Sequence, residues 1–143
     1  MSDVEVVRSI YHAMAARDFD RLFASVADDV VITQDPRLPW GGRHVGHDGL
    51  AQFALALTGA IDSAVKHEAL FEADGEVIQY GRTRGTVRAT GASFDIPEVH
   101  RWTVRDGRAV AAHFAIDTAA MLAVLDAPAN DAPDASAAPD AGA

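Results

Sequence analysis

Three residues whose side chains could act together in a reaction occupy every second position in one short segment of the sequence. Glu98, His100 and Trp102 are each separated by one residue, and Asp106-Gly107, a dipeptide typical of a tight turn between antiparallel strands, follows them. Successive side chains of an extended strand point to opposite faces, so these three residues are expected to share one face. A carboxylate beside an imidazole can accept and donate protons, and an indole can pack against a flat ligand. The spacing therefore predicts a site for acid–base chemistry.

The strands that must position this site fill the second half of the chain. The sequence is strand-like from residue 63 to residue 116, and three turn signals divide it at Asp74-Gly75, Thr90-Gly91 and Asp106-Gly107. Three turns between four strand-like runs predict a meander of long antiparallel strands. A β-branched run over residues 30–32 predicts one further, short strand near the N-terminal helices.

Two helices are predicted before that short strand. Apolar residues recur at helical spacing over residues 4–14, and Glu5 follows Ser2 by three residues, as in a capping box. A shorter apolar stripe over residues 19–26 predicts a second helix. We expect this second helix to end at Asp28-Asp29.

The middle of the chain is expected to be a loop followed by a third helix. Prolines and a glycine pair between residues 36 and 47 predict irregular backbone around Trp40, and a helical stripe follows over residues 48–59. Asp117 can cap a final short helix over residues 119–125. Helices followed by a curved antiparallel sheet predict an α+β domain, in which the helices cover one face of the sheet and the two layers enclose a cone-shaped pocket.

Composition predicts one domain and excludes several classes of function. A chain of 143 residues with 49% hydrophobic residues can bury a single core, which we assign to residues 1–125. Residues 126–143 are rich in Ala, Pro and Asp, and we expect a disordered acidic tail. The net charge of -9 argues against a nucleic-acid partner. No apolar run reaches membrane-spanning length, and the acidic start lacks the pattern of a secretory signal, so we expect a cytoplasmic protein.

Metal binding is not favoured by the residue pattern. The chain contains no Cys, which excludes disulfides, thiolate catalysis and Cys-ligated zinc. His44 and His47 lie three residues apart in the predicted loop, but no third ligand follows at a recognisable spacing. We therefore expect no metal and no other cofactor.

Several longer segments resemble a known superfamily. They are VVRSIYHAMAARDFD, VADDVVITQDP, LPWGGRHVGHDGL and EVHRWTVRDGRAV. With the order of the predicted elements, they make the chain similar to the nuclear-transport-factor-2-like superfamily, and within it to SnoaL-like polyketide cyclases and ketosteroid-isomerase-related proteins. The resemblance covers residues 4–125 and implies a cone-shaped fold with an internal pocket. It does not by itself imply one activity, because this superfamily includes isomerases, cyclases, hydrolases and proteins that only bind.

The resemblance also implies roles for individual residues. In the steroid isomerases a carboxylate in an Asp-Pro context is the general base, which corresponds to Asp35, and a protonated acid on a later strand corresponds to His100. Without gaps, their tyrosine on the first helix corresponds to Ile10, and Tyr11 lies one residue away, turned by about 100° on the helix. In the polyketide cyclases a Gln-x-His pair corresponds to Glu98 and His100, and the acid on the last strand corresponds to Phe114.

These observations leave two hypotheses. The first is a cofactor-independent isomerase or cyclase that moves a proton on an apolar or polycyclic, carbonyl-bearing ligand, with Asp35 or Glu98 as the base and His100 as donor or proton shuttle. The second is a non-catalytic binding or dimerisation module with the same fold. In either case the resemblance implies a homodimer. The residues expected to line the pocket are Tyr11, Met14, Trp40, Phe53, Trp102 and Phe114.

Overall fold

One curved sheet and the helices that pack on it make up the structure, a computed structural model that describes residues 1–129. The helices are α1 (Asp3–Ala16), α2 (Phe19–Ala24), α3 (Gly46–Ala60) and α4 (Thr118–Leu125). The strands are β1 (Val26–Gln34), β2 (Gly42–Val45), β3 (Ile61–Ala73), β4 (Glu76–Val87), β5 (Ser93–Arg105) and β6 (Arg108–Ile116). The predicted α+β class is confirmed.

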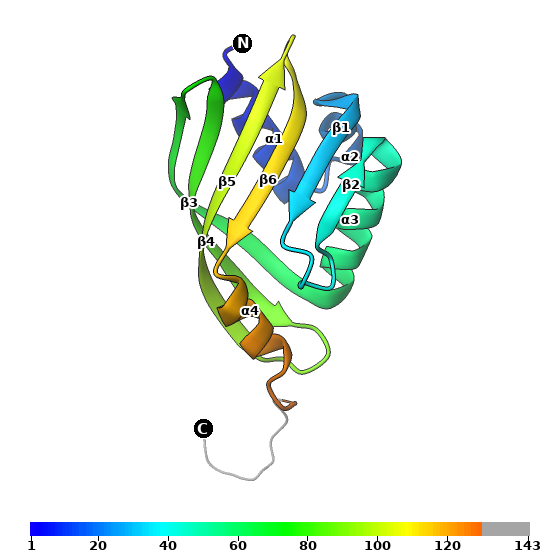
Figure 1. The fold of residues 1–143 in the computed structure, drawn as a ribbon, viewed down its shortest axis with the longest axis vertical. Helices are drawn as coiled ribbons and strands as arrows, with labels where there is room; N and C mark the ends of the chain where they lie inside the picture. The colour runs from blue at the N-terminus through cyan, green and yellow to red at the C-terminus, as the bar shows by residue number, and fades with distance from the viewer. Residues whose placement is uncertain (130–143) are drawn as a thin grey trace.

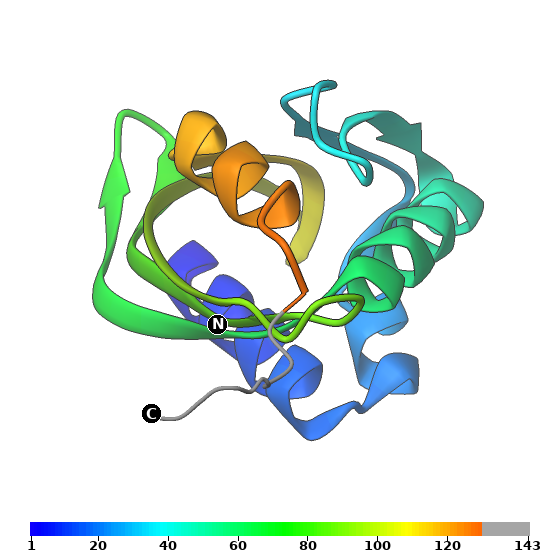
Figure 2. The same ribbon diagram turned by 90° about the horizontal axis from the view of Figure 1, so that it is seen from below.

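The six strands form a single sheet in the order β2-β1-β6-β5-β4-β3. Strands β3 to β6 pair antiparallel with their sequence neighbours, which confirms the predicted meander, and β1 adds to β6 in parallel. The sheet curves without closing, and α1 and α3 lie on the same side of it (Figure 1). Seen from below, α4 lies across the end of the sheet where β6 finishes (Figure 2).

Helix α1 places one side-chain stripe on the concave face of the sheet. The predicted capping box is present, because the Ser2 hydroxyl accepts from the Glu5 amide while the Glu5 carboxylate accepts from the Ser2 amide. The helix ends at Arg17, whose left-handed φ of 57° turns the chain. Its buried residues are Val6, Val7, Ile10, Tyr11 and Ala13, and the helix packs against β3, β4, β5 and β6. Tyr11 is therefore positioned above the middle of the sheet.

Two sequence-based expectations about element boundaries are wrong. Asp28-Asp29 does not end a helix, because α2 stops at Ala24 and both aspartates lie within β1 with their side chains exposed. The segment expected to be irregular contains β2, which pairs with β1 from Val45 to Gly42. In β2 the long-range pairing with β1 overrides the local preference of the residues, whereas Asp28 and Asp29 lie at an irregularity of β1 between the paired residues Val26 and Val31.

The part of the predicted tail from residue 130 to residue 143 lies outside the described residues. Among residues 1–129, no helix has both the length and the apolar character needed to span a membrane.

Candidate functional site

The candidate site is a row of buried side chains that crosses four strands. The register places Gln34 of β1 beside Phe114 of β6, Phe114 beside His100 of β5, and His100 beside Gln79 of β4. All four side chains are buried on the face that α1 covers. Glu98 and Trp102 flank His100 along β5 and are also buried, so the carboxylate, the imidazole and the indole share one face, as their spacing predicts.

A chain of hydrogen bonds joins helix α1 to this face. The indole N–H of Trp102 donates to the hydroxyl oxygen of Tyr11 at 2.9 Å, and that hydroxyl lies 2.6 Å from Nδ1 of His100. On the other edge of the imidazole, Nε2 of His100 lies 3.3 Å from Oε1 of Glu98. Four side chains from two elements therefore form one connected polar network inside an apolar layer.

The protonation of Tyr11 determines the direction of these bonds. Burial raises the pKa of Tyr11 far above its usual range, and the nearby Glu98 adds to this, while the hydrogen bond from Trp102 opposes it. The phenol therefore stays protonated, and because the indole N–H of Trp102 can only donate, Nδ1 of His100 is the partner among the described residues that can accept the phenol proton. A neutral imidazole that accepts at Nδ1 carries its proton on Nε2, which faces Glu98.

Aromatic rings enclose the network on the side of β6. The ring of Phe114 lies 4.6 Å from the imidazole of His100, 5.5 Å from Trp102 and 5.6 Å from Phe53, measured between ring centroids. These apolar rings exclude water from one side of the imidazole and offer flat surfaces to a ligand. With Tyr11, four of the six residues predicted to line the pocket are thus brought together with His100.

A pocket of about 260 Å³ has Phe114 in its wall. It opens where β1 ends at Gln34 while the neighbouring β6 continues to Ile116. Its lining residues are Asp35, Pro36, His113, Phe114, Ala115, Ile116 and Thr118. Phe114 therefore belongs to both the pocket wall and the aromatic cluster around His100.

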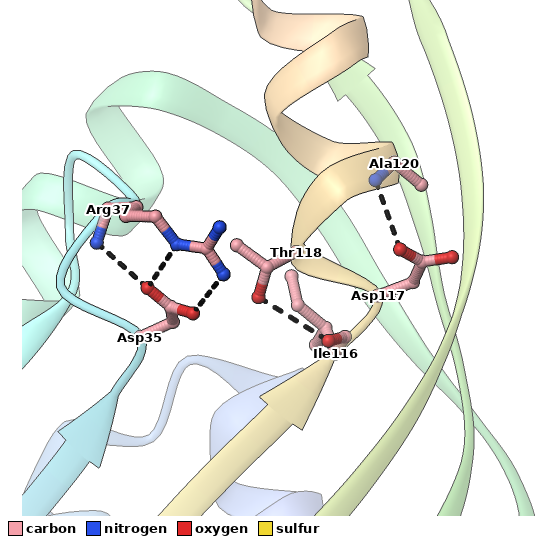
Figure 3. A network of polar contacts seen from close by, with 6 residues as sticks. All are labelled: Asp35, Arg37, Ile116, Asp117, Thr118 and Ala120. Atoms are coloured by element: carbon pink, nitrogen blue, oxygen red, sulfur yellow. Dashed lines mark hydrogen bonds and ion pairs between the residues drawn. The ribbon is translucent and has the colours of Figure 1, made fainter.

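Asp35 belongs to the pocket wall and not to the hydrogen-bonded network of His100. Its carboxylate accepts two hydrogen bonds from the guanidinium of Arg37, at 3.1 and 2.7 Å, and one from the Arg37 backbone amide at 3.0 Å (Figure 3). These bonds lower the pKa of Asp35 to about 2. A carboxylate held in this way is a weak base.

Two other predicted pocket residues lie apart from the network. Trp40 is buried and donates its indole N–H to Oε1 of Gln34 at 3.0 Å, so the loop of residues 36–41 is fixed to the end of β1. Met14 is 37% exposed near the end of α1. Neither makes a ring contact or hydrogen bond with His100 in the part of the chain that the structure describes.

Two residues that sequence reasoning missed lie beside the network. Gln79 occupies the position next to His100 on β4, and His67 of β3 packs the edge of its ring on Tyr11 at 4.6 Å. Partial burial lowers the pKa of His67, while the charge of Glu98 works in the opposite direction. Gln79 had a detectable signal, because it lies at period two from the apolar Val77 and so interrupts the buried face of its strand.

The histidines of the central loop have backbone partners. Nε2 of His44 lies within hydrogen-bond distance of the carbonyl oxygens of Trp40 and Gly41, and Nε2 of His47 lies 3.3 Å from the carbonyl oxygen of Val26. Within residues 1–129, no cluster of three or more His, Asp or Glu side chains has the geometry of a metal site.

The sequence and the fold were compared with known proteins. Residues 7–112 match the family described as the SnoaL-like domain. No match was found among the curated proteins.

Solved structures share the fold over most of the chain. An NTF2-like protein of unknown function from Burkholderia pseudomallei is 29% identical, with a TM-score of 0.81 over 89% of this chain and 100% of that one. TerC, crystallised with polyporic acid, is 22% identical, with a TM-score of 0.78 over 87% of this chain and 98% of that one. A protein from Xanthomonas campestris pv. campestris, provisionally described as a polyketide cyclase, is 20% identical, with a TM-score of 0.74 over 85% and 94%.

Proposed function

The chain belongs to the SnoaL-like domain family, and from this premise and the geometry of its buried network we propose a cofactor-independent enzyme that moves a proton on a small molecule. The ligand is apolar or polycyclic and bears a carbonyl group. Similar structures include a complex with polyporic acid and a protein provisionally described as a polyketide cyclase, which supports a small-molecule ligand of this kind.

The observation that supports catalysis is the unequal environment of the two oxygens of Glu98. Oε1 lies 3.3 Å from Nε2 of His100, whereas Oε2 is buried and makes no hydrogen bond with the described residues. An unsolvated carboxylate oxygen with a fixed orientation is suited to remove a proton from carbon. His100 orients this carboxylate and, through Tyr11, is itself held in one tautomer.

The proposed reaction begins at a carbon next to the ligand's carbonyl group. Oε2 of Glu98 takes the proton, the electron pair of the C–H bond becomes part of a C=C bond, and the carbonyl oxygen gains the negative charge. Return of that proton from Glu98 to a different carbon gives an isomer. Attack of the enolate carbon on a second carbonyl of the same molecule, with the proton passing to the new alkoxide, closes a ring.

Glu98 and Asp35, the two carboxylates considered as the base, have different surroundings. Glu98 contacts His100, whereas Asp35 is held by Arg37 and has a pKa of about 2. We therefore assign the base to Glu98.

Steroid enones and β-keto esters should be screened for turnover, and Glu98→Gln and His100→Ala should each lower kcat/KM by about 10²- to 10⁴-fold. Unchanged turnover in both variants, or a matching loss in Asp35→Asn alone, contradicts the assignment.

A second candidate function is a binding module without catalysis. It is favoured by Phe114, because phenylalanine cannot transfer a proton at the position where the polyketide cyclases are expected to have an acid. The same screen distinguishes the two functions. Compounds that raise the melting temperature without forming any product, in the wild type as well as in Glu98→Gln, favour the binding module.

The exposed face of the sheet supports a homodimer. Phe71, Tyr80 and Val99 are large apolar residues on the face opposite His100, and Tyr80 and Val99 are paired in register. Burial of such a patch against a second copy removes apolar area from water. Sedimentation equilibrium should give a dimer mass that Tyr80→Glu converts to a monomer; a monomeric wild type contradicts this proposal.

The domain boundary after residue 125 and the cytoplasmic location remain predictions.

A further inference from the structure

Gln79 is a buried amide whose polar atoms have no hydrogen-bond partner among the described residues. Its side chain is 0% exposed, and neither Nε2 nor Oε1 makes a hydrogen bond with the described residues. A buried donor and a buried acceptor without partners both destabilise a protein, so they need an explanation. Gln34, which lies in the same row of the sheet, shows the ordinary arrangement, because its Oε1 accepts from the indole of Trp40.

Gly81 shows where the amide of Gln79 lies. The two residues point to the same face of β4, and a Cβ atom placed on Gly81 would come within 2.6 Å of Nε2 of Gln79. The amide therefore occupies the space above Gly81. Gly81 is the register partner of Glu98, whose Oε2 also lacks a hydrogen-bond partner. A free donor, a free acceptor and a free carboxylate oxygen thus lie on neighbouring positions of β4 and β5.

His100 has no nitrogen left for a ligand in this arrangement. Its Nδ1 accepts from Tyr11 and its Nε2 faces Glu98. An enolate formed next to Glu98 needs a hydrogen-bond donor for its oxygen. The N–H groups of Gln79, whose strand position is paired with His100, are buried donors without a hydrogen-bond partner among residues 1–129.

We propose that Gln79 binds the carbonyl oxygen of the ligand through Nε2 and accepts a hydrogen bond from a neighbouring N–H or O–H group of the ligand through Oε1. This inference rests on the proposed function and specifies its ligand class: a flat molecule in which a donor stands beside a carbonyl, such as an amide, a hydroxy ketone or an enolised diketone. The donor to the developing enolate is then Gln79, while His100 orients the base.

The same substitution at Gln79 and at Gln34 tests whether Gln79 serves the fold or the ligand. Methionine has nearly the shape of glutamine without its polar atoms. Gln79→Met removes two unpartnered polar groups, so we expect the melting temperature of the protein without ligand to stay the same or rise by about 4 °C. Gln34→Met leaves the indole N–H of Trp40 without a partner, and we expect its melting temperature to fall by at least a similar amount.

A pair of neutral probes measures the ligand contact directly. 2-Naphthamide offers a donor beside its carbonyl, whereas methyl 2-naphthoate has the same ring and a carbonyl but no donor. By calorimetric titration, the wild type should bind the amide about tenfold more tightly than the ester. Gln79→Met should reduce this preference to less than about twofold, and Gln34→Met, measured below its melting temperature, should retain it.

Three results overturn the inference. They are a melting temperature of Gln79→Met several degrees below that of the wild type, an amide preference that survives in Gln79→Met, and a wild type that shows no preference or binds neither probe. None of these is the result that overturns the proposed function, which is unchanged turnover in Glu98→Gln and His100→Ala. Loss of the Gln79 contact alone therefore leaves the assignment of the base intact.

Discussion

The hydroxyl of Tyr11 lies 2.6 Å from Nδ1 of His100 and joins the first helix to the middle of β5. The two residues are 89 positions apart in the sequence, so only the packing of α1 on the sheet brings them together. This contact orients the imidazole, because a phenol that is kept protonated by burial has Nδ1 of His100 as its acceptor, while the indole of Trp102 can only donate to it. The orientation of Glu98 follows from it.

Removal of the Tyr11 hydroxyl should destabilise the protein and free the imidazole. Tyr11→Phe leaves Nδ1 of His100 and the indole N–H of Trp102 buried without partners, so we expect the free energy of unfolding to fall by about 1–3 kcal/mol. Nitrogen-15 NMR should show one tautomer of His100 in the wild type and a mixture in the variant. Tyr80→Phe, on the exposed face, is the control and should leave both measurements unchanged. A single, unaltered tautomer in Tyr11→Phe contradicts the proposed direction of the hydrogen bonds.

Truncation of Phe114 should connect the pocket with the network. Its ring lies 4.6 Å from the imidazole of His100, and Phe114 also lines the pocket of about 260 Å³, so Phe114→Ala should allow larger ligands to reach the imidazole. We expect a gain in affinity for anthryl over naphthyl ketones, with a loss of stability of about 3–5 kcal/mol. Phe114→Leu retains most of the apolar volume, so its gain in affinity for anthryl ketones and its loss of stability should both be smaller. A size preference that is the same in all three proteins is incompatible with a role for this ring in limiting access to the imidazole.

Acidification should weaken the contribution of Asp35 to stability. Arg37 lowers the pKa of Asp35 from 3.8 to about 2, so the charged carboxylate stabilises the folded protein above about pH 4, and this stabilisation is lost as the pH falls toward 2. The difference in urea midpoint between the wild type and Asp35→Asn should therefore be largest at pH 5 and shrink by pH 3. Arg37→Gln should reduce the same pH dependence, because it removes the guanidinium but keeps the backbone amide that also donates to Asp35. A difference that does not change between pH 5 and pH 3 disproves the coupling.

A side chain at Gly81 should force β3 and β4 apart. A Cβ atom there would lie 2.1 Å from the carbonyl oxygen of Lys66 and 2.6 Å from Nε2 of Gln79, and a backbone oxygen cannot move without disturbing the strand. Gly81→Ala should lower the free energy of unfolding by about 1–3 kcal/mol. Gly59 in α3 has no atom near its Cβ position, so Gly59→Ala should instead stabilise the protein by about 0.5–1 kcal/mol. Equal effects of the two substitutions would show that space above Gly81 is not limiting.

Most elements of the fold could be read from local patterns. The capping box at Ser2, the helical stripe of α1 and the turns at Asp74-Gly75 and Asp106-Gly107 all depend on residues that are neighbours in the sequence. Asp74 and Asp106 take up left-handed backbone in these turns, with φ values of 55° and 52°, followed by the positive φ of the glycines. Local preference failed in β2, where pairing with β1 supplied the stabilisation, and at Asp28-Asp29, which lie at an irregularity in the pairing of β1 with β6.

The membership of the site could be predicted only in part. Glu98, His100 and Trp102 follow from period-two spacing within one strand. The position of Gln79 beside His100 depends on the register between β4 and β5, and a shift of one residue would have placed its side chain on the opposite face. Asp35 has the sequence context of a catalytic base, but Arg37, two residues away, holds its carboxylate in an ion pair.

The sequence by itself therefore determined most of the helices and strands, apart from the start of β1 and the whole of β2, and it determined that a carboxylate, an imidazole and an indole share one face of β5. The reason is that periodicity and turn chemistry act between neighbours in the chain. Only the tertiary structure decided that Tyr11 meets His100, that Gln79 lies beside it with polar atoms that have no hydrogen-bond partner among the described residues, and that Phe114 both contacts His100 and lines the pocket. These contacts depend on strand register and on the packing of α1 against a curved sheet, which are set by the burial of the whole core and not by any local segment.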